Sequence, residues 1–248
     1  MSKTEKGPDK AVDVCMTRTG GFELRKLLRS VLASPAFEDM LKGLDMPPER
    51  VIGPLLCFLY ETDEPIRWRA VRGVGIMVAA LAEKDLESAR IIMRRLIWSL
   101  NDESGGIGWG APEAMGEIMA ENGVLAGEYY RILVSYIDED GNPLGNDALE
   151  RGVMWAIGRL ARKRPGLFRE TTRPILAQVN SPDPEKRGLA LRALLSLRKG
   201  GLEFDLPSSL LRPLTEDHAE IRVFEDGVFE EYKISRLALK LFDQPACP

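Results

Sequence analysis

Side chains suited to binding a ligand gather in the middle of the chain, where residues 101–117 read NDESGGIGWGAPEAMGE. This segment holds an amide, several carboxylates and a tryptophan, and a second tryptophan and an arginine follow at 155 and 159. An aromatic wall beside acids and a guanidinium suits a ligand with cationic and polar parts, or a peptide that carries arginine or lysine. The residues of this predicted groove are Asn101, Asp102, Glu103, Trp109, Glu113, Glu117, Trp155 and Arg159.

No residues with catalytic or metal-ligand spacing accompany this groove. The single histidine, His218, argues against a Ser-His-Asp triad and against a histidine-containing zinc site. The glycines of 104–108 lack the Gly-Lys-Ser/Thr ending of a phosphate-binding loop. An acidic loop from Asp138 has Leu149 where a calcium loop has its last glutamate. We therefore expect no metal, no cofactor and no catalytic residues, and we favour a protein that is not an enzyme.

The composition narrows the class of protein further. The 248 residues are 44% hydrophobic and 29% charged, with a formal net charge of −4. An acidic balance disfavours nucleic acid as a partner, because nucleic-acid-binding domains are usually basic. No apolar run approaches the roughly 20 residues of a membrane span, and the first residues lack the apolar region of a signal peptide. We expect a cytoplasmic protein with a protein partner, no membrane contact and an oligomeric state that the sequence leaves open.

The elements that must position the groove repeat along the chain. Segments beginning at Arg72, Arg151 and Arg187 open with Arg-Gly and continue with apolar residues at helical spacing. Segments at Trp109 and Arg236 fit the same register, and the five points are spaced by 37, 42, 36 and 49 residues. A period near 40 with two helices in each unit is typical of an α-solenoid.

Each repeated helix requires a partner helix before it, and the sequence places these at 48–60, 86–100, 125–138, 167–179 and 206–215. We predict an all-α fold: a right-handed α-solenoid of about five helix pairs. It would form a single domain over 21–248, behind a flexible segment 1–20. Glycines recur at 73, 110, 152 and 188 although a glycine inside a helix costs about 1 kcal/mol. Their recurrence predicts neighbours that come too close for a side chain.

The longest spacing contains a predicted β-hairpin near 220–233. Asp226-Gly227 is a strong signal for a two-residue turn. Pairing across that turn sets Phe224 opposite Phe229, Arg222 opposite Glu231 and Glu220 opposite Lys233. We expect this hairpin to cap the open end of the solenoid, with an edge offered to a partner as the alternative.

The arginine-bearing second helix, the period near 40 and an aspartate four residues before the arginine resemble HEAT-like repeats. Among these they look most like the short variant named after phycocyanobilin lyases, and the resemblance covers roughly residues 48–242. It implies that aspartates and arginines bond between adjacent repeats. The residues of this predicted ladder are Arg72, Asp147, Arg151, Asp183 and Arg187. Asp147 and Asp183 also stand where a helix N-cap belongs.

The leading hypothesis is a non-enzymatic scaffold or adaptor that binds a partner on the concave face, which second helices usually line. The alternative is a HEAT-like nucleic-acid-processing protein of the DNA glycosylase type. By analogy alone, its site would consist of Trp109, Trp155, Asp102 and Glu113. The acidic balance opposes that alternative. A lyase or chaperone for a chromophore is a third possibility, by the family name alone.

The groove residues also have a purely structural interpretation. Glu117 and Arg159 suit an ion pair between repeats, and Trp155 suits the core. The glycines around Trp109 suit a tight turn. The sequence leaves the choice between groove and scaffold open.

Overall fold

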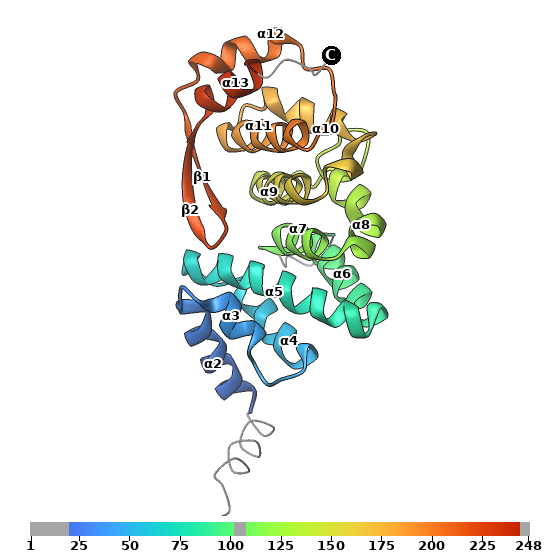
Figure 1. Ribbon diagram of the computed structural model, residues 1–248, viewed down its shortest axis with the longest axis vertical. Helices are drawn as coiled ribbons and strands as arrows, with labels where there is room; N and C mark the ends of the chain where they lie inside the picture. The colour runs from blue at the N-terminus through green and yellow to red at the C-terminus, as the bar shows by residue number, and fades with distance from the viewer. Residues whose placement is uncertain (1–19, 102–107, 244–248) are drawn as a thin grey trace, which may run out of the picture.

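The computed structural model describes residues 20–101 and 108–243, and these residues form a stack of helices with one two-stranded hairpin (Figure 1). The predicted segment 1–20, except for its last residue, and the groove residues Asp102 and Glu103 lie outside the described residues. The predicted fold class, an all-α solenoid with a small hairpin, is confirmed. The helices are α2 (Gly21–Ala33), α3 (Phe37–Lys42), α4 (Pro48–Phe58), α5 (Glu64–Lys84), α6 (Leu86–Leu100), α7 (Ala111–Glu121), α8 (Gly123–Ser135), α9 (Asp147–Lys163), α10 (Thr172–Ala177), α11 (Pro184–Lys199), α12 (Ser208–Leu211) and α13 (Ile234–Phe242).

The helices pair as α4/α5, α6/α7, α8/α9, α10/α11 and α12/α13. The second helices stack on one another in chain order, so that α5 packs on α7, α7 on α9, α9 on α11 and α11 on α13. Helices α6, α8 and α10 form a first-helix layer along one side of this stack (Figure 1). We call the opposite side of α5, α7, α9 and α11 the second-helix face.

Capping residues fix where the helices begin. The Asp183 carboxylate accepts from the Glu185 amide at 2.9 Å, as predicted for the N-cap of α11. The N-cap of α9 is Asn146, whose side chain accepts from two amides of the first turn, so the prediction of Asp147 as the cap is wrong by one residue. Asparagine caps as well as aspartate, and Asp147 then lies in the first turn, where its charge favours the helix dipole.

The recurring glycines do mark close approaches. A Cβ on Gly73 or Gly188 would lie 3.0 Å from Leu41 or 2.6 Å from Ile221. The tightest contacts between second helices fall at two glycines outside that pattern. A Cβ on Gly75 would lie 2.6 Å from the Cβ of Glu117, and one on Gly116 would lie 2.5 Å from the Cβ of Ala156. These glycines let α5, α7 and α9 approach almost backbone to backbone.

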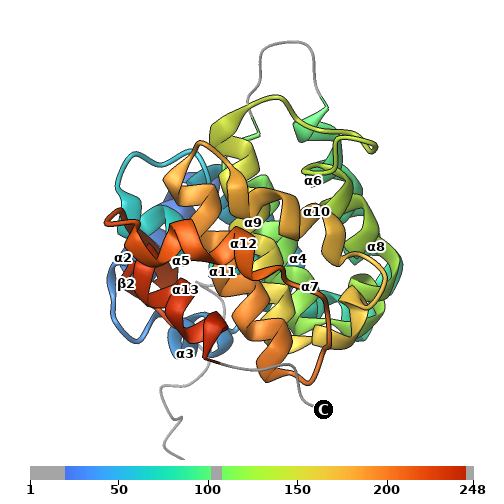
Figure 2. The same ribbon diagram turned by 90° about the horizontal axis from the view of Figure 1, so that it is seen from above.

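The hairpin consists of β1 (Glu220–Glu225) and β2 (Val228–Lys233), and its pairing follows the predicted register at every position. Its predicted role as an end cap is wrong. The hairpin extends from the C-terminal unit back along the second-helix face towards α5, on the side of the stack opposite α8 (Figures 1 and 2). Ile221, Val223 and Phe224 are all buried there. Burial of their apolar side chains stabilises the hairpin in this folded-back position.

None of the described helices is long and apolar enough to cross a membrane.

The close approach at Gly116 makes a specific prediction for stability. Gly116→Ala should lower the free energy of unfolding by about 1–3 kcal/mol, because the added methyl group collides with α9. Gly127→Ala in α8 is the matched control, since a Cβ at that exposed position meets nothing within 4 Å. The control should gain about 0.5–1 kcal/mol from helix propensity. Urea unfolding of both variants measures the difference, and equal effects would contradict the packing.

Candidate functional site

An ion network links three second helices in the middle of the stack. Glu117 of α7 accepts from Arg72 of α5 at 2.8 Å and from Arg159 of α9 at 2.9 Å. Glu121, one turn further along α7, accepts from the same two arginines at 2.5 and 3.1 Å. Arg72 also donates to Glu38 of α3 at 3.0 Å. The pair that the sequence offered as a structural alternative, Glu117 with Arg159, is thus part of a larger network.

Burial makes the members of this network depend on one another. Only 3% of Glu117 and 8% of Arg159 is exposed, so removing one partner would leave a buried charge without compensation. Burial lowers the pKa of Arg72, but the hydrogen bond to Glu38 and the charge of Glu117 outweigh it, and the net pKa is raised. For Glu121, burial alone would raise the pKa. The hydrogen bond from Arg72 and the positive charges of Arg72, Arg159 and Lys163 outweigh burial, so the net pKa is lowered. Lys163, which is exposed at the end of α9, thus adds its positive charge to those that act on Glu121.

A small cavity of about 30 Å³ lies over this network and under the hairpin. Its walls include Arg72, Glu117, Trp155 and Arg159. The Nη1 of Arg159 is buried and has no hydrogen-bond partner within the described chain. A cavity of this size holds a water molecule, which would satisfy that donor. The cavity brings together three of the predicted groove residues, but it is too small for a larger ligand.

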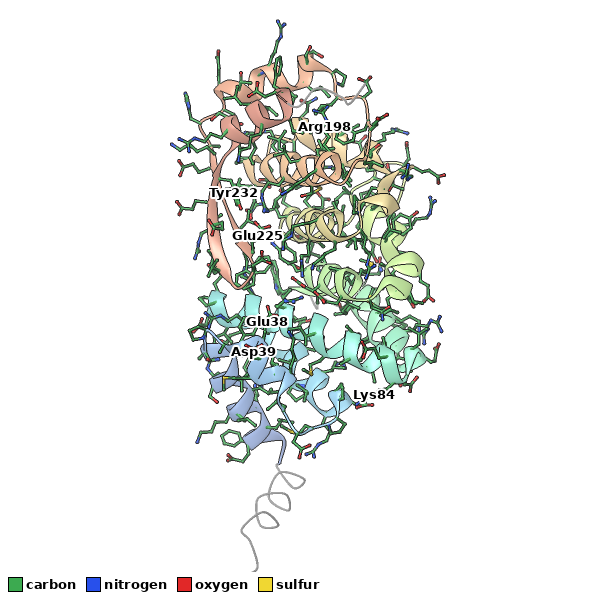
Figure 3. The ribbon with its side chains drawn as sticks, in the orientation of Figure 1. Glu38, Asp39, Lys84, Arg198, Glu225 and Tyr232 are labelled. Atoms are coloured by element: carbon green, nitrogen blue, oxygen red, sulfur yellow. The ribbon has the colours of Figure 1, made fainter. Side chains whose placement is uncertain are left out.

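The tip of the hairpin closes the cavity with acidic side chains. Glu225 pairs with Arg162 of α9 and with Arg192 of α11, and Asp226 accepts from Arg162 at 2.9 Å. The Tyr232 hydroxyl donates to Glu225 at 2.8 Å, and the Arg192 guanidinium stacks on the Tyr232 ring. Figure 3 shows Glu225 and Tyr232 between the hairpin and the helices. Two arginines of the solenoid are thereby neutralised by the chain's own hairpin.

An aromatic cluster anchors the hairpin beside these ion pairs. Trp155 is 7% exposed, and its indole N–H donates to the carbonyl oxygen of Phe224 at 3.0 Å. Trp68 of α5 contacts Trp155 with ring centroids 4.7 Å apart and stacks on Phe224 at 5.5 Å. Phe229 completes the cluster at 5.3 Å from Phe224. Trp155 therefore binds the hairpin, and no free face is left for stacking on a nucleobase.

Glu113 lies apart from the cavity, with its carboxylate packed on Gly152 of α9. A Cβ at Gly152 would lie only 2.8 Å from the carboxylate oxygens, so this glycine makes the space for them. The Oε2 of Glu113 is buried without a hydrogen-bond partner within the described chain. Burial raises the pKa of Glu113 to about 7, helped by the charge of Glu185 and opposed by that of Arg67. Glu113 is therefore only partly ionised near neutral pH.

Asn101 lies at the end of α6, and Trp109 lies just before α7, and neither is at the cavity. The Asn101 amide donates to the Tyr136 hydroxyl at 3.2 Å and to the Ile97 carbonyl at 2.8 Å, which ties the end of α6 to the end of α8. Trp109 is 38% exposed and precedes Gly110, whose positive φ of 73° starts α7. Neither residue lines the cavity, so the structure does not bring the whole predicted groove together.

The predicted ladder residues make pairs between successive units. Arg151 donates to Asp183 at 2.6 Å, and Arg187 donates to Asp217 at 2.6 Å. Asp147 instead accepts from Lys186 at 2.7 Å. Arg72 departs from the ladder because α7 offers it glutamates in place of an aspartate before the helix.

Sequence reasoning missed four residues that hold the hairpin: Trp68, Arg162, Arg192 and Glu225. Trp68 lies one turn before Arg72 on α5, where two other units have Asp147 and Asp183, so the repeat register gave no signal for it. Arg162 and Arg192 were visible as charges, but their partners depend on where the hairpin lies. Among residues 20–101 and 108–243, no group of three or more histidine, cysteine or acidic side chains could hold a metal ion.

Comparisons with known proteins define the fold more than the function. No protein-family model matches the chain. An uncharacterized protein of Archaeoglobus fulgidus is 35% identical over 107 residues, which is 43% of this chain. The chain spans about half (52%) of that relative's length.

Among solved structures, a designed armadillo repeat protein aligns with 92% of the chain and 95% of its own length, at a TM-score of 0.50 and 15% identity. A second designed armadillo repeat protein, solved in complex with the peptide (KR)4, aligns with 89% of the chain and 99% of its own length at a TM-score of 0.46 and 18% identity. An archaeal HEAT-like repeat protein from Thermococcus onnurineus covers 90% of the chain and 96% of its own length at 0.36 and 14%. With the stacked helix pairs, the first of these similarities defines the fold as an armadillo/HEAT-like helical repeat.

The raised pKa of Glu113 makes stability depend on pH. The folded state holds this proton more tightly than the unfolded chain, so wild-type stability should fall as pH rises from about 4.5 to about 7. Glu113→Gln lacks the proton equilibrium, and it should be more stable than wild type by roughly 1–2 kcal/mol at pH 8 and about equal to it at pH 4.5.

Denaturant unfolding across this pH range measures both variants. Glu139→Gln is the control, because Glu139 is exposed on a loop and its amide variant should track the wild type. Parallel stability curves for Glu113→Gln and wild type would show that Glu113 ionises normally.

Proposed function

We propose that this chain is a non-enzymatic interaction scaffold that binds a protein partner on its second-helix face. The observation that supports the proposal is that this face already holds an extended segment of the chain itself. Strand β1 lies on it through a hydrogen bond from the Trp155 indole to the Phe224 carbonyl, stacking of Phe224 on Trp68, and ion pairs of Glu225 with Arg162 and Arg192. Stacked helical repeats provide extended surfaces of this kind for binding partners.

The partner would bind on the part of this face that the hairpin leaves uncovered. Lys163 at the end of α9 is exposed, and its charge acts on Glu121 of the ion network. Lys199 at the end of α11 is also exposed. The buried network beneath gives this surface a rigid base, which lowers the entropy lost when a partner binds.

The other hypotheses find less support. The glycosylase-type alternative needs its tryptophans and acid together in one accessible site, but Trp155 is buried against Phe224 and Trp109 does not line the cavity. The resemblance to phycocyanobilin-lyase repeats remains a prediction about this chain. An absorbance titration with a bilin tests it directly, and a lack of any spectral shift would remove it.

Charge reversal on opposite sides of the stack tests the scaffold. The full chain, immobilised as bait, should capture a partner that Lys163→Glu releases by at least about fivefold, because the reversal places repulsion at the proposed surface. Arg173→Glu is the matched control, since Arg173 of α10 is exposed on the first-helix layer. Quantitative mass spectrometry of the captured proteins, with melting curves of both variants, provides the measurement.

Two outcomes would count against the proposal. Equal loss of the partner with both variants would show that binding does not use the second-helix face. Capture of no protein, together with binding of a small metabolite by the purified chain, would replace the scaffold with a ligand-binding protein.

A further inference from the structure

The hairpin stands on edge against the solenoid, and its pairing shows which main-chain groups face outward. Asp226 and Gly227 have φ values of 48° and 90°, so the turn is a two-residue one and Glu225 forms a hydrogen-bonded pair with Val228. In an antiparallel pair, hydrogen-bonded and non-hydrogen-bonded residue pairs alternate, so every second pair from Glu225–Val228 is hydrogen-bonded. Two contacts agree with this assignment of hydrogen-bonded pairs. The Ile234 amide donates to the Ala219 carbonyl at 3.0 Å, and the Phe224 carbonyl points out of the hairpin to accept from Trp155.

The same alternation leaves the outer edge of β2 unpaired. The N–H and C=O groups of Phe229 and Glu231 point away from β1, and within the described chain they make no backbone hydrogen bond outside the hairpin. The edge of β1 is used differently, because it faces the helices. Figure 1 shows the hairpin along the outside of the stack, with no further strand beside it. An unpaired strand edge is a ready template for another extended chain.

A groove of about 360 Å³ lies at the α13 end of β2. Its charged lining residues are Glu220 of β1, Glu231 and Lys233 of β2, and Arg236 and Lys240 of α13. Leu237, buried to 3% exposure, also lines it. The groove therefore adjoins the C-terminal end of β2 and carries the exposed cations of α13.

The charges along this surface specify what it would bind. Lys233 pairs with Glu220 at 3.2 Å, whereas the exposed Arg236 and Lys240 form no ion pair within the described residues. Glu230 and Glu231 carry the opposite charge further along the strand. A second copy of β2 would set these glutamates against one another, which disfavours a homodimer through this edge.

We propose that β2 and α13 bind an extended segment of a partner protein, which adds to β2 as a third strand and places carboxylates over Arg236 and Lys240. The residue of that segment opposite Glu231 is basic or neutral, because like charges across a strand pair repel. Main-chain bonds to β2 give affinity, and the charges select the sequence. This surface is distinct from the second-helix face, so the two proposals stand or fall separately.

Random dodecapeptides displayed on phage, selected against the full chain, provide the probe. We expect extended peptides with acidic residues at one end, and synthetic copies are titrated by fluorescence anisotropy. Glu231→Pro removes an N–H that the hairpin does not use, and proline is tolerated on edge strands. It should weaken binding at least about tenfold, whereas Glu231→Thr keeps the N–H and should not. The double variant Arg236→Ala with Lys240→Ala should weaken binding by about fivefold or more, with a smaller salt dependence.

Three results would overturn the proposal. The first is equal affinity for Glu231→Pro and wild type, and the second is selection of no peptide or of peptides without acids. The third is a dimer of the free chain that Glu231→Pro dissociates, which would assign the edge to a second copy. If Glu231→Pro alters the melting curve, N-methylation of alternate peptide amides tests the same main-chain bonds on the unchanged protein.

Discussion

The buried carboxylate of Glu117 is the constraint on which the centre of this structure depends. A glutamate that is 3% exposed is stable as an anion only when cations replace the lost water, and here Arg72 and Arg159 do so from the helices on either side. The arrangement requires α5, α7 and α9 to lie unusually close together. Gly75 and Gly116 supply that closeness, because a methyl group at either position would collide with the next helix. The glycines therefore permit the close packing that brings both arginines to the buried carboxylate.

The hairpin follows from the same electrostatics. With Glu117 and Glu121 already satisfied by Arg72 and Arg159, the second-helix face still carries Arg162 and Arg192 close to one another. The acidic tip of the hairpin, Glu225 and Asp226, neutralises both. The aromatic cluster around Trp155 adds apolar burial, which does not weaken with salt as the exposed ion pairs do. An extra segment of chain has thus become part of the solenoid's core.

The sequence predicted most of the fold because repeats carry their information locally. Apolar spacing and caps placed the helices, and the Asp226-Gly227 turn with its matched charges set the hairpin register to the residue. The position of the hairpin was wrong, because its partners lie far away in the chain: Arg222 meets Glu64 and Phe224 meets Trp68. The sequence placed Glu117, Trp155 and Arg159 in one predicted groove, and all three line the cavity. It could not show that the hairpin covers them, nor that Glu113 turns instead towards Gly152.

Because the hairpin stands edge-on to the helices, β1 faces them while the outer edge of β2 is exposed. Strand β1 is buried on both faces, since Ile221, Val223 and Phe224 all pack inward, and its outer edge meets Trp155. A two-stranded hairpin held in this way has only one edge left, and that edge belongs to β2. The exposed glutamates of β2 keep it from pairing with copies of itself, which is the usual protection for an open strand. They do so without covering the main chain, so the edge stays selective for a partner whose charges complement those of β2 and α13.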